Sequence, residues 1–186
     1  RVSTLYESSG DFTGTDPRAA LWSPMPVFNE KEDRWNLTYV AYKCKPDTKT
    51  SWYINHDGTI YRAVSSVRGL DGLGGPYVDL RVILQPGTDS DPWEGLQGTD
   101  SFFMYPVKDR WYAFYGSART EHWPCDFWGV GLATAPDMAG PWKRCSELNP
   151  VNLQSVFAEN PVVTQFDNGI YIAMVDGGGF NEKFGY

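Results

Sequence analysis

Short runs of aromatic and β-branched residues alternate with clusters of Gly, Pro, Asn and Asp along most of the chain. No window keeps an apolar period of about 3.6 residues over the length that a helix needs. The pattern therefore predicts an all-β protein of short strands joined by turns and loops. The predicted strands form three groups: 21–28, 35–42, 51–55 and 59–65; 101–105, 111–116, 127–133 and 141–144; 161–164 and 170–175.

The second and third groups repeat one another. Asp100 precedes the first strand of the second group, and Glu159 precedes the first strand of the third, 59 positions later (159 − 100). Four-stranded antiparallel units that recur about every 40 to 60 residues are typical of a β-propeller. A repeated unit with an acid at its start can bring acids from separate units to one shared centre.

The strand groups divide the chain into a lead-in at 1–20, a blade at 21–68, a second blade at 98–145 and a partial blade at 157–186. Within the first blade, Asp57-Gly58 predicts a tight hairpin turn, because Gly tolerates positive φ. About two and a half blades cannot close a ring that needs at least about four. We therefore expect a missing segment, a partner chain or a second copy to complete a larger propeller.

Composition narrows the classes of partner. The 186 residues, 41% of them hydrophobic, suffice for one domain, and an aromatic content of 16% suits strands and surfaces that stack on flat ligands. A net charge of −7 without a Lys/Arg run argues against nucleic acid and anionic membranes. Cys44, Cys125 and Cys145 lack metal-site spacing, which leaves open one disulfide with a free thiol or three thiols.

Four motifs follow in order along residues 21–178. They are Trp-Ser-Pro-Met-Pro-Val at 22–27, Thr-Asp-Ser at 99–101 with Tyr-Gly-Ser at 115–117, Val-Gly-Leu-Ala-Thr-Ala at 130–135 with Gly-Pro-Trp at 140–142, and Glu-Asn-Pro at 159–161. The series resembles the five-bladed β-propeller glycosidases, most closely glycoside hydrolase family 43. That family has Trp-Ala-Pro-Asp-Val, Ile-Asp-Pro, Tyr-Gly-Ser, Ile-Gly-x-Ala-x-Ser, Gly-Pro-Trp and Glu-Gly-Pro at these points.

The chain departs from this pattern at three points. Ser101 stands where the family has Pro, Asn160 where it has Gly, and Met25-Pro26 where it has Asp-Val. The related invertase and levansucrase families have Arg-Asp-Pro and Glu-Cys-Pro at the corresponding points. Thr99 and Asn160 argue against these two families.

Glycoside hydrolysis needs a protonated carboxyl for the leaving oxygen and an ionised one as base or nucleophile. The resemblance implies that Glu159 is the acid and that Asp100 tunes the pKa and position of that acid. It places the base on an upstream blade; Asp16-Pro17 superficially fits, but no first-blade strands follow it. We therefore expect the base on the missing portion, about 6.5–9.5 Å from the acid if the enzyme inverts configuration. For either acid alone, the alternative is a cap at the start of a strand.

Further residues are candidates for sugar binding, with ordinary packing as the alternative for each. The loop between the second and third strands of a blade returns to the end where the acids lie, as does the glycine-rich loop at 176–181. His56, on the predicted hairpin, falls at the other end and is not expected to be a ligand. The candidates are Trp22, Trp93, Arg119, His122, Trp123 and Asp176.

Together these observations predict an extracellular or periplasmic glycosidase that acts on arabinose-, xylose- or galactose-containing glycans. The partner is an oligosaccharide or polysaccharide, no cofactor is required, and a structural calcium ion remains open. Alternatives are a non-catalytic carbohydrate-binding propeller and a fructan- or sucrose-acting or phosphorolytic relative.

Overall fold

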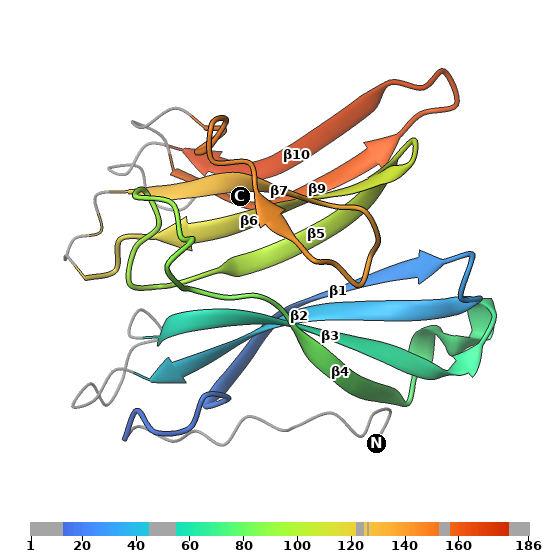
Figure 1. Cartoon of the computed structure of the whole chain (residues 1–186), viewed down its shortest axis with the longest axis horizontal. Helices are drawn as coiled ribbons and strands as arrows, with labels where there is room; N and C mark the ends of the chain where they lie inside the picture. The colour runs from blue at the N-terminus through green and yellow to red at the C-terminus, as the bar shows by residue number, and fades with distance from the viewer. Residues whose placement is uncertain (1–12, 45–54, 122–124, 126, 153–156, 179–186) are drawn as a thin grey trace.

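The structure is a computed structural model that describes residues 13–44, 55–121, 125, 127–152 and 157–178. One four-stranded antiparallel sheet holds β1 (Ala20–Asn29), β2 (Arg34–Cys44), β3 (Asn55–Arg68) and β4 (Tyr77–Leu84), in chain order. A second holds β5 (Asp100–Val107), β6 (Arg110–Ala118), β7 (Trp128–Ala135) and β8 (Lys143–Arg144), also in chain order. β9 (Phe157–Gln165) pairs with β10 (Tyr171–Gly178), and Figure 1 shows this pair beside the second sheet. In the described part of the chain, no helix has the length and hydropathy to cross a bilayer.

The first sheet corrects two details of the predicted blade at 21–68. The hairpin predicted at Asp57-Gly58 is wrong, because both residues lie inside β3. Gly58 is needed there for a close approach: its N–H donates to the Gln97 carbonyl at 2.7 Å, and a Cβ would collide with the Thr99 carbonyl. The sheet also has a fourth strand, β4, so that this blade continues to Leu84.

Apolar side chains fill the space between the two four-stranded sheets. Val40, Tyr42 and Ile60 from the first sheet belong to one buried cluster with Phe102 and Tyr115 from the second. The Thr38 hydroxyl donates to the Phe102 carbonyl across the interface at 2.8 Å. Burial of this shared core is the main force that holds the sheets together.

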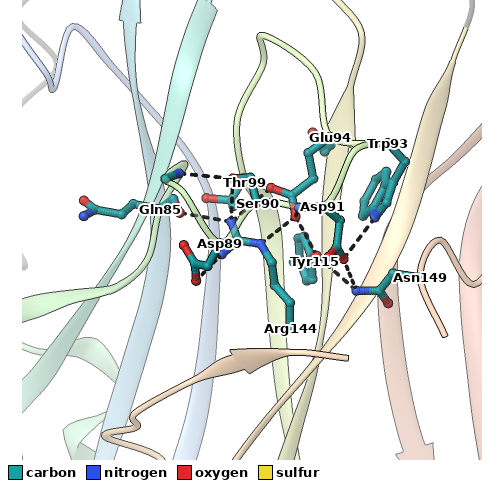
Figure 2. A network of polar contacts seen from close by, with 12 residues as sticks. Gln85, Asp89, Ser90, Asp91, Trp93, Glu94, Thr99, Tyr115, Arg144 and Asn149 are labelled. Carbon is teal, nitrogen blue, oxygen red and sulfur yellow. Dashed lines mark hydrogen bonds and ion pairs between the residues drawn. The ribbon is translucent and has the colours of Figure 1, made fainter. Parts of the chain in front are cut away.

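A buried polar network anchors the linker between the sheets (Figure 2). Arg144 Nε donates to Glu94 Oε1 at 2.6 Å, and both side chains are almost fully buried, at 2% and 3% exposed. The Tyr115 hydroxyl donates to the same Glu94 oxygen at 2.8 Å, and Asn149 Nδ2 donates to Asp91 at 2.8 Å. A buried ion pair with such additional donors fixes geometry, because loss of either partner leaves an uncompensated charge.

The innermost strands β1, β5 and β9 begin alike. Ser23, Ser101 and Asn160 have positive φ angles of 51°, 43° and 49°, which side chains other than Gly rarely adopt. The pairing register shifts at this point in all three strands, as in a β-bulge. The preceding residues therefore occupy equivalent positions in three units: Trp22, Asp100 and Glu159. The repeat predicted from the two acids is confirmed in the backbone.

Candidate active site

Asp100 and Glu159 lie together where β5 and β9 begin. The residues that follow them are joined directly, because the Ser101 hydroxyl donates to Asn160 Oδ1 at 2.6 Å. The charge of Asp100 acts on the carboxyl of Glu159. The structure thus brings together the two acids that the sequence repeat singles out.

Asp100 is a buried carboxylate, 5% exposed, surrounded by donors. The Ser101 N–H donates to Oδ1 at 2.6 Å, and Gln97 Nε2 donates to Oδ2 at 3.3 Å. Burial raises the pKa of Asp100, while hydrogen bonds from Tyr42 and Ser101 lower it in part. These donors favour the ionised form of Asp100, although the residue is almost completely shielded from solvent.

Glu159 also has a raised proton affinity. Burial raises the pKa of Glu159 to about 7, and the negative charges of Asp100 and Asp176 add to the effect. A carboxyl with this pKa is protonated in about half of the molecules at neutral pH and can donate its proton to a reacting oxygen. The arrangement therefore combines a proton donor with two neighbouring carboxylates.

Asp176 belongs to strand β10 and not to the predicted glycine-rich loop, since β10 continues to Gly178. It pairs in register with Glu159, and its Oδ2 accepts a hydrogen bond from Asn160 Nδ2 at 3.1 Å. The structure therefore places it beside the two acids.

Tyr42 and Gln97 are site residues that sequence reasoning missed. The Tyr42 hydroxyl donates to Asp100, and burial together with the charge of Asp100 raises the pKa of Tyr42 far above its usual range. Tyr42 lies two residues after the core residue Val40 on β2, so both side chains face the core. This pattern indicated a core position and not a site residue. Gln97 lies in the linker before β5, where no periodic signal exists.

The other candidates for sugar binding have different outcomes. Trp22, 44% exposed, lies at the start of β1, in the position equivalent to the two acids. Trp93 is wrong as a pocket wall: it is 6% exposed, packs against Tyr115 and Phe127 in the core, and donates from Nε1 to Asp91 at 3.3 Å. It is buried because the linker folds into the core between the sheets.

Arg119 extends from the end of β6, with its guanidinium 5.4 Å from the centre of the Phe127 ring. His122 and Trp123 lie outside the described residues. His56 changes its position: because no hairpin forms at Asp57-Gly58, it lies at the beginning of β3, paired with Lys43. It is therefore at the same end of the blade as Trp22 and not at the far end.

The described residues contain no group of three or more His, Cys, Asp or Glu side chains placed to hold a metal ion. Cys145 is a free thiol.

No protein-family model matches the chain, and no curated protein matches it. Solved structures do. A family 43 β-xylosidase/α-arabinofuranosidase from a compost microbial metagenome, in complex with xylotriose, matches with a TM-score of 0.59 at 17% identity, over 82% of this chain and 41% of its own. An endo-arabinase from Bacteroides thetaiotaomicron matches with a TM-score of 0.59 at 17% identity, over 88% of this chain and 53% of its own.

A family 117 glycoside hydrolase from the marine bacterium Zobellia galactanivorans matches with a TM-score of 0.59 at 14% identity, over 90% of this chain and 50% of its own. The chain therefore spans about half the length of these structures. The likeness establishes the fold, so the predicted all-β propeller of the glycoside hydrolase type is confirmed.

Proposed function

We propose that this chain supplies the proton-donating part of a glycoside hydrolase active site, with Glu159 as the general acid. The observation that carries the proposal is a half-buried glutamate that pairs in register with Asp176 and lies beside Asp100, whose charges and the burial of the site raise its pKa to about 7. Asp100 raises that pKa through its charge and, through the bond between the residues that follow the two acids, holds the acid in place. The fold shared with xylosidase and arabinase structures supports glycan hydrolysis as the general reaction.

The proposed reaction is an inverting hydrolysis. Glu159 gives its proton to the glycosidic oxygen as the bond between that oxygen and the anomeric carbon breaks. A water molecule attacks the anomeric carbon from the opposite side and passes one proton to a general base. The base lies outside the described residues, and transfer of that proton through solvent returns Glu159 to its acid form.

Arabinose-, xylose- or galactose-containing glycans are the proposed substrates. One structural neighbour was solved with xylotriose, which supports an oligosaccharide ligand. The exposed indole of Trp22, equivalent in position to the acids, is suited to stack on the apolar face of a sugar ring. Because such glycans are polymers outside the cell, we place the enzyme in an extracellular or periplasmic location.

Further strands are proposed to complete the propeller beyond β10. In the described structure this strand exposes large apolar side chains, among them Ile172, Met174 and Val175. Exposed apolar strands are normally covered by another strand or sheet. The general base is proposed to lie on another blade of this propeller, outside the described residues.

The test is a substrate panel with the purified full-length protein. Arabino-, xylo- and galacto-oligosaccharides are incubated with wild type, Glu159→Gln and the control Glu147→Gln, which changes an exposed glutamate. We expect release of sugars by wild type and by the control, and a loss of about 10²–10⁴-fold in kcat for Glu159→Gln. Unchanged hydrolysis in Glu159→Gln would overturn the proposal, and glycan binding without product in any variant would establish a binding module instead.

A further inference from the structure

A chain of hydrogen bonds crosses the beginnings of the three innermost strands, through the residues that follow Trp22, Asp100 and Glu159. The hydroxyls of Ser23 and Ser101 lie 3.3 Å apart, and Ser101 Oγ lies 2.6 Å from Asn160 Oδ1. Asn160 Nδ2 donates to Asp176 Oδ2 at 3.1 Å. The chain thus links three separate units and ends on a carboxylate.

The number of protons on each group determines which group donates in each of these hydrogen bonds. A serine hydroxyl has one proton, and a carboxamide oxygen only accepts. The Ser101 hydroxyl lies 3.3 Å from Asp100 Oδ1 but only 2.6 Å from Asn160 Oδ1, so the shorter bond to Asn160 is the better one for its proton. Ser101 can in turn accept a proton from Ser23. The reverse orientation of the amide would place its oxygen against an oxygen of Asp176, so the bond from Asn160 Nδ2 to Asp176 Oδ2 assigns the NH₂ group to this side.

The backbone at Asn160 gives a second reason to ask what its side chain does. Its φ of 49° suits Gly and costs about 1 kcal/mol or more for most other residues, although Asn tolerates it best. Glycine would relieve this strain, and the resembling family has Gly here. Ser101 is also a departure from that family, and these two departures bond to each other.

We propose that Asn160 is a positioning residue whose amide, held by Ser101, fixes the carboxylates of Asp100 and Asp176 beside Glu159. The inference rests on the proposed function for its catalytic meaning, while its geometry is independent of it. The side chain of Asn160 bonds to Ser101 and to Asp176. It acts because it ties Asp176 on β10 to the residue next to Asp100 on β5.

The titratable groups around Glu159 determine the direction of the effect. Asp100 faces it from β5, Asp176 from β10, and Tyr42 from β2. The two carboxylates repel an ionised Glu159, so like charges held near it raise its pKa. If the tie is removed, these carboxylates move apart and the pKa of Glu159 falls.

The experiment compares Asn160→Gly with wild type in the full-length protein, using two readouts: the pKa of the Glu159 carboxyl by ¹³C NMR titration and the pH profile of kcat. We expect the pKa and the alkaline limb to move toward lower pH by about half a unit or more. The melting temperature should stay the same or rise, because Gly relieves the backbone. If the role of Asn160 were only structural, Asn160→Gly would instead lower the melting temperature without changing the pKa of Glu159.

A double-mutant cycle and a matched control complete the design. Ser101→Gly breaks the same bond from the other side, so it should shift the pKa in the same direction, and the double variant should shift it no further. Lys108→Gly relieves a comparable backbone strain, at a φ of 56° in the turn after β5, and should leave the pKa of Glu159 unchanged. An unmoved Glu159 pKa in Asn160→Gly, or fully additive shifts, would overturn the positioning role. Absence of hydrolysis in wild type would instead refute the proposed function, while the titration still decides the positioning.

Discussion

Asp176 lies directly across from Glu159 in the β9–β10 pair, and its charge joins that of Asp100 in raising the pKa of Glu159. The two neighbours are not equal, since Asp100 contributes the larger effect. Asp100 is also buried, whereas Asp176 is exposed to solvent, which screens its charge. The site therefore has one strong and one weaker charge acting on the same proton.

The unequal charges predict an order of effects. Asp100→Asn and Asp176→Asn should both lower the pKa of Glu159, and the shift should be larger for Asp100→Asn. Because the acid form is required, the alkaline limb of kcat should move to lower pH in the same order, each by about one unit or less. The pH profiles of both variants check this, and the opposite order would contradict it.

The hydrogen bond from Tyr42 to Asp100 leads to a prediction for the pKa of Asp100. In Tyr42→Phe the buried carboxylate loses a donor, so the pKa of Asp100 should rise and the free energy of unfolding should fall by about 1–3 kcal/mol. Tyr39→Phe is the matched control, because its hydroxyl donates to Asp79 at 2.7 Å in the same blade. The control should lose comparable stability and leave the Asp100 titration unmoved, as measured by ¹³C NMR.

Glu159 also predicts how stability depends on pH. Its pKa is raised from 4.5 to about 7, so the folded protein binds this proton more tightly than the unfolded chain. The stability associated with the group is therefore full below about pH 4.5 and is lost as pH rises toward 7, by up to about 3 kcal/mol.

In Glu159→Gln this dependence should disappear, so that the variant is more stable than wild type at pH 8 and differs little at pH 5. Urea unfolding at the two pH values measures the difference. An equal effect of the substitution at both values would show that the pKa of Glu159 is not raised.

The buried Arg144–Glu94 pair predicts a large loss of stability. Arg144→Ala leaves Glu94 buried without its cation, which should cost about 3–5 kcal/mol in urea unfolding. Arg110→Ala, at an exposed arginine that contacts Thr134, should cost less than about 1 kcal/mol. Similar losses in the two variants would contradict a specific role of the network in Figure 2.

Features that depend on local pattern were predictable from the sequence. Asp100 and Glu159 stand at a fixed spacing near the beginnings of β5 and β9, and strands β5, β6, β7 and β10 follow the predicted runs closely, whereas β9 begins at Phe157, before the predicted run at 161–164. Contacts between distant segments were not predictable. The glycine at 58 suggested a turn, but it serves the approach of the linker at 97–99, which no local pattern encodes.

Trp93 and Tyr42 show the same limit in the candidate site. An aromatic residue before a blade can wall a pocket or fill a core, and only the folded linker decides that Trp93 is buried. Tyr42 lies on the core-facing side of its strand, and its hydroxyl is part of the candidate site only because β5 places Asp100 beside it. Non-local packing determines both outcomes.

Dependence on the leaving group tests the role of Glu159 most directly. A general acid matters most when the leaving oxygen is basic, and little when the leaving group is an acidic phenol. For the full-length protein, Glu159→Gln should lower kcat by about 10²–10⁴-fold on oligosaccharides and by less than about tenfold on dinitrophenyl glycosides of the same sugar. An equal loss on both substrates, or no loss on oligosaccharides, would contradict Glu159 as the proton donor.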